Sequence, residues 1–161
     1  MPDLGRAGDG TIEVQLEGYE AELLRRLCGE MRLLLEADLP RADPVTDRIF
    51  PRAYEDAGDE DAYRELVGTT LKDYKLEALD AVEGALGEEG PARVSLKDED
   101  RDRWLTFLTD TRLALGTRLG VTEETMTREP DPDSPDAVAL SVLHWVGWIQ
   151  EQILEKAMED G

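Results

Sequence analysis

The feature that most constrains the fold is the spacing of apolar side chains, which recur every three or four residues in four long stretches of the chain. This spacing matches the 3.6-residue turn of an α-helix that buries one face. Pro40 and Pro44 end the first helix, and Gly87 ends the second. The predicted helices span residues 19–35, 60–86, 98–119 and 135–160. We expect Tyr19, Tyr74 and Val138 to lie on their buried faces.

Two short segments show a different pattern, in which apolar and polar residues alternate as in a half-buried strand. They are residues 11–17 and 92–96. Strands of this size are stable only when a helical layer covers them, so we expect them to pair as a small ribbon. Residues 1–10 hold three glycines and no pattern, which favours a flexible tail. The sequence therefore predicts a mainly α fold, a bundle of four long helices with a minor two-stranded β element, as one domain over residues 11–161.

The charge of the chain restricts its partners. Asp and Glu number 38 against 18 Lys and Arg, which gives a formal net charge of −20. Such a surface repels phosphate backbones and anionic lipid, so we expect neither nucleic-acid nor membrane binding. The charge serves solubility, or it lets the protein dock on a basic partner or mimic nucleic acid. The most apolar stretch, residues 137–149, is shorter than the roughly 20 residues of a membrane span, and no secretory signal is visible. We expect a cytoplasmic protein.

Few residues are available for catalysis. Cys28 is the only cysteine and His144 the only histidine, so the chain cannot supply a zinc site of His and Cys ligands. Cys28 lies in an apolar stripe and is interpreted as a core residue. The chain has no Gly-x-Ser-x-Gly motif and no glycine-rich phosphate loop. We therefore predict no cofactor and no catalytic residues.

An acidic stripe on the second helix leaves one enzymatic alternative open. Asp73, Glu77 and Asp80 recur at helical spacing, and Glu77-Ala-Leu-Asp80 matches one half of the metal site of all-α nucleotide pyrophosphohydrolases. Carboxylates on facing helices hold magnesium or manganese in such bundles. A suitably spaced Glu-x-x-Glu element upstream is missing, because none lies between about residues 49 and 65. A solvated face is the alternative interpretation of the stripe.

Four residues are candidates for contact with a ligand or partner. Asp110, Arg112 and Arg118 interrupt an apolar stretch of the third helix. Arginines in such a setting usually pair with carboxylates and cover apolar surface with their stems. The functional alternative is a pocket for an anion or a carboxylate, formed by Arg112 with Arg48. Trp148 lies three residues from Trp145 on the last helix and is a candidate interface anchor, although core packing explains both tryptophans as well.

Three segments resemble the actinobacterial family called domain of unknown function 2017. They are Arg48-Ile-Phe-Pro-Arg-Ala-Tyr54, Asp110-Thr-Arg-Leu-Ala-Leu-Gly-Thr-Arg-Leu-Gly120 and Trp145-Val-Gly-Trp-Ile-Gln-Glu151. Their order and spacing match, together with the strand at residues 92–96, so the resemblance covers nearly the whole chain. The family has no assigned activity and no established catalytic residues. Its members are often encoded beside the N-end-rule adaptor of the Clp protease and a metalloprotease linked to sulfur-carrier chemistry.

These observations leave three hypotheses. The first is a non-catalytic interaction or regulatory protein with an unknown protein partner, accessory to Clp-type proteolysis, as the resemblance implies. The second is a divalent-metal hydrolase that uses Asp73, Glu77 and Asp80. The third is a small-anion binding domain centred on Arg112 and Arg118. A homodimer is a further expectation, because helical bundles with tryptophans near one end often form dimers.

Overall fold

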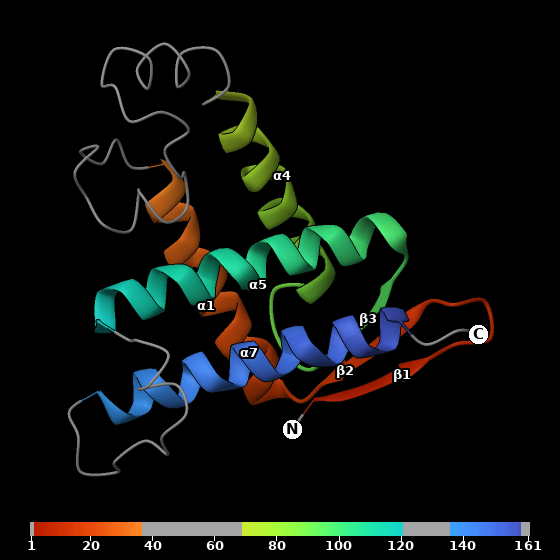
Figure 1. Cartoon of the computed structure of the whole chain (residues 1–161). Coiled ribbons are helices and arrows are strands. Elements are labelled where there is room, and N and C mark those ends of the chain that lie inside the picture. Colours follow the sequence, from red (N-terminus) through yellow and green to blue (C-terminus); the bar gives the residue numbers. More distant parts are fainter. Residues whose placement is uncertain (1, 37–68, 121–135, 159–161) are drawn as a thin grey trace.

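The computed structural model describes residues 2–36, 69–120 and 136–158, and Figure 1 shows its course. In these ranges the chain forms four helices and three strands. The strands are β1 (Asp3–Arg6), β2 (Ile12–Leu16) and β3 (Ala92–Leu96), and the helices are α1 (Gly18–Glu36), α4 (Thr69–Leu86), α5 (Asp98–Leu119) and α7 (Ala137–Met158). The mainly α prediction is confirmed, and the predicted bounds of α5 are correct. The predicted helical residues 60–68 lie outside the described part of the chain.

Each described helix packs against the one that follows it in the chain. α1 contacts α4, α4 contacts α5, and α5 contacts α7. The small sheet lies at the end of the bundle that holds the start of α5 and the end of α7 (Figure 1). β2 contacts α1 and α7, and β3 contacts α4 and α5, so the sheet contacts all four described helices.

The sheet has three antiparallel strands in the order β1-β2-β3, and not the two that we predicted. β2 and β3 pair as expected, with Val14 opposite Val94. The additional strand β1 lies in the segment predicted to be a flexible tail, and its Leu4 pairs opposite Val14. Two of the three glycines of this segment, Gly8 and Gly10, lie in the turn between β1 and β2: Gly10 has a φ of 89°, and its N–H donates to the Ala7 carbonyl at 3.0 Å. A left-handed φ is the conformation that glycine adopts most readily.

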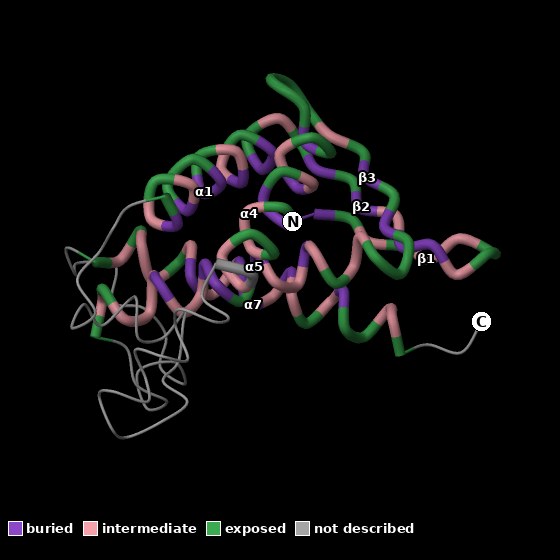
Figure 2. Tube along the Cα trace, turned by 90° about the horizontal axis from the view of Figure 1, so that it is seen from above, coloured by how far each residue is buried: buried purple, intermediate pink, exposed green. Residues whose placement is uncertain are grey.

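The core lies where the inner face of the sheet meets the four helices, and Figure 2 shows buried positions along these helices and along β2 and β3. Trp104 of α5 is among the largest fully buried side chains. Cys28 is also fully buried, in agreement with its interpretation as a core residue. The other side chains at the centre of this cluster include Ile12, Val14, Leu24, Leu79, Val82, Leu108, Ile149 and Ile153.

Three residues that we expected on buried faces lie on the surface. Tyr19 is 67% exposed, Tyr74 47% and Val138 78%. Tyr19 and Val138 occupy the first turns of α1 and α7. Helical spacing extends a stripe into these turns, but only neighbouring elements can cover it. Periodicity was therefore a poor guide to burial at the helix ends.

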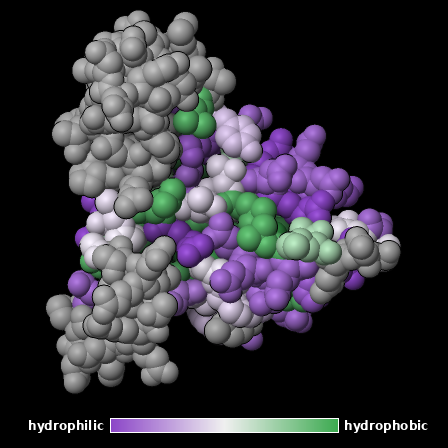
Figure 3. All heavy atoms as spheres, viewed as in Figure 1, coloured by the Kyte–Doolittle hydropathy of each residue, from purple (hydrophilic) through white to green (hydrophobic). Residues whose placement is uncertain are grey.

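The surface of the described part is largely hydrophilic. Figure 3 shows charged and polar residues over much of one face, with apolar residues in a band across its middle. None of the described helices combines the length and the apolar character that a membrane crossing requires.

Candidate functional site

The acidic stripe on α4 is partly engaged in ion pairs. Asp73, Glu77 and Asp80 are exposed. Arg32 of α1 donates from Nη2 to Asp80 at 2.5 Å and from Nε to Glu83 at 3.1 Å. Within residues 2–36, 69–120 and 136–158, no group of three or more His, Cys, Asp or Glu side chains could hold a metal ion. The described part of the chain therefore gives the metal hypothesis no support.

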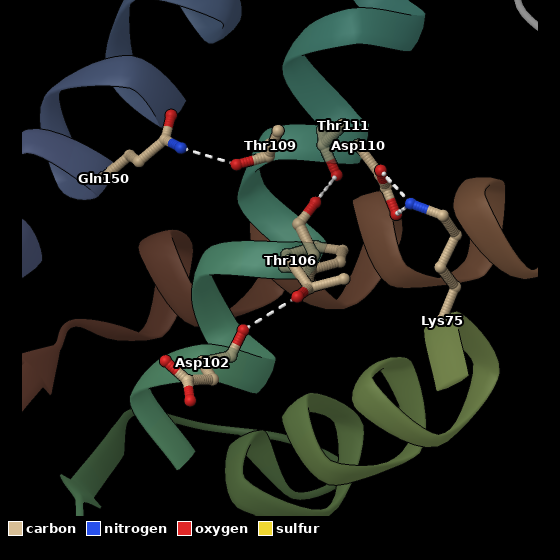
Figure 4. A network of polar contacts seen from close by, with 8 residues as sticks. Lys75, Asp102, Thr106, Thr109, Asp110, Thr111 and Gln150 are labelled. Carbon is tan, nitrogen blue, oxygen red and sulfur yellow. Dashed lines mark hydrogen bonds and ion pairs between the residues drawn. The ribbon is translucent and has the colours of Figure 1, made fainter. Parts of the chain in front are cut away.

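The structure does not bring Arg112 and Arg118 together. Arg112 faces α7, where its Nη1 donates to Gln150 Oε1 at 2.7 Å, and Gln150 in turn donates to Thr109 at 2.6 Å (Figure 4). The guanidinium of Arg112 lies over Gly147, and a Cβ there would be 3.4 Å from Nε. Arg118 lines a groove between α5 and α1. Arg48 lies outside the described residues.

A buried ion pair joins α4 to α5 (Figure 4). Lys75 Nζ lies 2.7 Å and 3.0 Å from the two carboxylate oxygens of Asp110, which is only 4% exposed. Burial raises the pKa of Asp110, and the Lys75 charge acts in the opposite direction. The sequence showed Asp110 as a polar residue in an apolar stretch, but nothing in the spacing indicated Lys75 as its partner. The pair is a structural link between the two helices.

The tryptophans of α7 are both partly buried against the core. Neither tryptophan is among the exposed large apolar side chains of the described residues. Trp145 lines a groove between α7 and α1. This α1–α7 groove has a volume of about 630 Å³. It is lined by Tyr19, Glu20, Leu23, Ala137, Val138, Ser141, Val142 and Trp145.

The α1–α7 groove combines an apolar lining with negative charge. Glu20 lies in its wall, only 2% exposed, and its Oε1 accepts the backbone N–H of Glu17 at 2.9 Å. The carboxylates of Glu17 and Glu20 raise the pKa of the Tyr19 hydroxyl above its ordinary value of 10.0. Among the described residues that line the groove there is no Lys or Arg. The potential at the Tyr19 hydroxyl is therefore negative.

Two other hollows are less suited to a partner. An α1–α5 groove of about 460 Å³ is mostly apolar, but Glu30 and Arg118 place opposite charges on it. A polar hollow of about 580 Å³ lies where the β1–β2 turn meets the start of α5, and Arg6 reaches it. Its lining also includes charges of both signs, Lys97 and Arg101 together with Asp9, Asp98, Glu99 and Asp100, so it favours neither an anion nor a cation.

The sequence did not identify the α1–α7 groove, because Tyr19 and Val138 were expected to be buried. The signal that could have found it is their position in the first turns of two long helices. When the apolar stripe of a helix starts before the point where a neighbouring element covers it, its first apolar residues stay exposed to solvent.

Comparison with known proteins identifies a family but no individual relative. No curated protein and no solved structure matches the chain. A family model described as "Domain of unknown function (DUF2017)" matches residues 1–157, which is nearly the whole chain. The match agrees with the resemblance of the segments around Asp110 and Trp145. The chain therefore belongs to the DUF2017 family.

Proposed function

We propose that this protein is a non-catalytic interaction or regulatory protein of the cytoplasm, and that the α1–α7 groove is its binding surface. The observation that carries the proposal is the gathering of Tyr19, Val138 and Trp145 in one hollow, with the first two largely exposed. Contiguous exposed apolar surface on a soluble domain marks sites of interaction. Tyrosine and tryptophan are enriched in protein interfaces, because each offers a large contact area with few rotatable bonds.

The geometry of the groove favours a protein partner over a small substrate. It is open along two helices, and the polar side-chain groups of its described lining are those of Glu20 and Ser141, the Tyr19 hydroxyl and the Trp145 indole N–H. A catalytic pocket needs a nucleophile or a base next to a group that orients it. The described lining residues offer no such pair, so binding is the chemistry that they support.

For the cellular role, we propose an accessory function in Clp-type proteolysis. The gene neighbourhood of the family, beside the Clp adaptor, supports this proposal. An accessory protein of this kind binds partners and leaves catalysis to the protease, which agrees with a binding surface that lacks catalytic groups.

The proposal is tested by affinity capture from host lysate with three immobilised proteins. They are the wild type, the double variant Tyr19→Ser/Val138→Ser, and Met158→Ser as a matched control. Met158 is 81% exposed on the last turn of α7, far along the same helix from Val138. All three substituted residues are exposed, so the variants should fold with stability changes within about 0.5 kcal/mol.

We expect mass spectrometry to find proteins that the wild type and Met158→Ser retain and the double variant loses. Clp subunits among these proteins would support the proposed cellular role. Identical recovery on all three proteins would show that the groove is not the binding surface.

A further inference from the structure

We infer that a second copy of this chain covers the α1–α5 groove, so that the protein forms a symmetric dimer in which the two grooves face each other. The lining of this groove shares no residue with the α1–α7 groove, so the inference stands apart from the proposed function. Three properties carry it: an apolar hollow, an exposed apolar side chain at its edge, and one charge of each sign on its lining.

The apolar part of the groove combines a hollow with an exposed leucine. Leu27 and Met31 of α1 and Ala114 of α5 line the groove and are themselves buried. Leu33 lines the same groove but is 74% exposed. The volume of about 460 Å³ falls within the range of roughly 300–1,000 Å³ typical of ligand sites, so the hollow has room for a large apolar side chain. Exposed apolar surface of this kind marks a site of interaction on a soluble domain.

The groove also carries two opposite charges on two different helices. Glu30 of α1 and Arg118 of α5 line it, and both are exposed. Neither forms an ion pair with another residue of the described part of the chain. Arg26, one turn before Glu30, is exposed as well but does not line the groove. The described lining is therefore neutral as a whole, and its two charges are available to a partner.

A two-fold axis makes such a surface complementary to itself. In an isologous dimer, residue i of one copy contacts residue j of the other, and residue j of the first contacts residue i of the second. Glu30 of each copy would then face Arg118 of the other, and Leu33 of each copy would enter the hollow of the other. Opposite charges across an interface fix its register. A partner with charge of a single sign would instead place a like charge against either Glu30 or Arg118.

The net charge of −20 on each copy is compatible with this contact. That charge is spread over the whole surface, and at 0.15 M salt the Debye length of about 8 Å screens exposed charges that lie further apart. Groups that meet across the two-fold axis lie closer than this and keep their attraction. We therefore expect the dimer to be most stable near physiological ionic strength and to weaken at low salt, where the net repulsion reaches further.

The experiment is sedimentation velocity ultracentrifugation over a concentration series, at about 0.15 M NaCl, where the Debye length is about 8 Å. The wild type is compared with Leu33→Ser, Glu30→Arg and Arg118→Glu. The matched controls are Glu151→Arg on α7 and Arg93→Glu on β3, which reverse exposed charges outside the groove. All five residues are exposed, so the variants should keep the wild-type fold, which circular dichroism checks.

We expect the wild type to form a dimer whose dissociation constant rises about tenfold or more in Leu33→Ser, because the substitution removes the apolar anchor. Glu30→Arg and Arg118→Glu should each weaken the dimer to a similar extent, because each places like charges together at two points of the interface. The two control variants should leave the dissociation constant unchanged.

An equimolar mixture of Glu30→Arg and Arg118→Glu gives the sharpest test of the proposed pairing. In the mixture one copy carries two positive charges on its groove and the other carries two negative charges. A mixed dimer should therefore form at concentrations at which each variant alone is a monomer. Restoration of this kind requires contact between two chains, and an effect within one chain would not produce it.

Three results would overturn the inference. A wild type that stays monomeric at every concentration would show that no second copy covers the groove. A dimer that Tyr19→Ser/Val138→Ser disrupts and Leu33→Ser leaves intact would place the contact in the α1–α7 groove. A mixture of Glu30→Arg and Arg118→Glu that stays monomeric would refute their pairing across the two-fold axis. The first and third results leave the proposed function as it stands, because that function is tested by capture through the α1–α7 groove.

Discussion

At the scale of single residues, Asp110 is one of the two described carboxylates that are buried, and Glu20 is the other. Asp110 is 4% exposed, and Lys75 of α4 supplies its cation. Burial raises its pKa above the ordinary value of 3.8, so folding favours the protonated form. The contribution of Asp110 to the free energy of unfolding is therefore largest below pH 3.8 and falls as the pH rises through the raised pKa.

Replacing Lys75 with methionine tests how far the stability of the fold depends on the ion pair with Asp110. The variant leaves Asp110 buried without its cation, which should lower the free energy of unfolding by about 3–5 kcal/mol at pH 7. The pKa of Asp110 should rise further, so the loss should shrink as the pH is lowered from 7 towards 4.5. Urea unfolding at both pH values measures the effect.

Two variants complete this test. Lys75→Met/Asp110→Leu removes both charges and should recover most of the lost stability. Lys72→Met removes a partly exposed lysine of the same helix and should change the stability little. A loss for Lys75→Met that is the same at pH 7 and pH 4.5 would contradict the assignment of the effect to Asp110.

Tyr19 offers a test of the negative potential around its hydroxyl. Its hydroxyl should form a phenolate only above the ordinary pKa of 10.0, because Glu17 and Glu20 repel the charge. Glu17→Gln should lower the Tyr19 pKa, and Glu22→Gln should change it less. The 295 nm absorbance difference between each protein and its Tyr19→Phe counterpart follows the titration. A Tyr19 that titrates at or below pH 10.0 would argue against a negative potential at this hydroxyl.

At the scale of elements, the end of α4 depends on a side chain from α1. Arg25 donates from Nη2 to the carbonyls of Leu86 at 2.8 Å and Gly90 at 2.7 Å, and from Nε to Gly87 at 2.9 Å. The last carbonyls of a helix have no partner within it, so these bonds satisfy groups that would otherwise need water. Gly87 and Gly90 have φ values of 73° and 79°, which lets the chain turn away from the helix towards β3.

Replacing Arg25 with methionine should destabilise this junction. The variant keeps most of the apolar stem but loses three hydrogen bonds from a charged donor, and we expect a loss of about 1.5–3 kcal/mol in urea unfolding. Arg26→Met is the control, because Arg26 is exposed on the same helix and should change the stability by no more than about 0.5 kcal/mol. Equal effects of the two substitutions would show that Arg25 does not hold the end of α4.

At the scale of the whole molecule, the net charge of −20 opposes the compact state. The ionic strength sets how far this repulsion reaches, because the Debye length falls from about 30 Å at 0.01 M to about 10 Å at 0.1 M. Ion pairs such as Arg32–Asp80 weaken with salt, but carboxylates outnumber cations by 38 to 18. The screening of repulsion among carboxylates should therefore outweigh the weakening of the ion pairs when salt is added.

We expect the free energy of unfolding in urea to rise when NaCl is increased from 10 mM to 200 mM. Urea is uncharged and leaves the ionic strength unchanged during the titration. A stability that falls with added salt would mean that the ion pairs contribute more than the net repulsion removes.

The sequence by itself determined the number and position of the described helices and the pairing of β2 with β3. Apolar spacing and glycine or proline stops are local properties, so they can be read from a single segment. The sequence could not predict β1, because Leu4 is the only residue of Asp3–Arg6 that packs on the core, and backbone pairing with β2 holds the strand in place. An edge strand of this kind is defined by its neighbour and not by its own residues.

Only the tertiary structure decided which residues meet and which stay open to solvent. Lys75 and Asp110 lie 35 residues apart and come together because α4 packs on α5. Tyr19 and Val138 share a groove because the first turns of α1 and α7 line one hollow, in which both side chains stay largely exposed. Periodicity assigns a residue to a face of its own helix, but burial depends on what lies opposite that face. For this reason the helices could be predicted from the sequence, whereas the candidate binding surface could not.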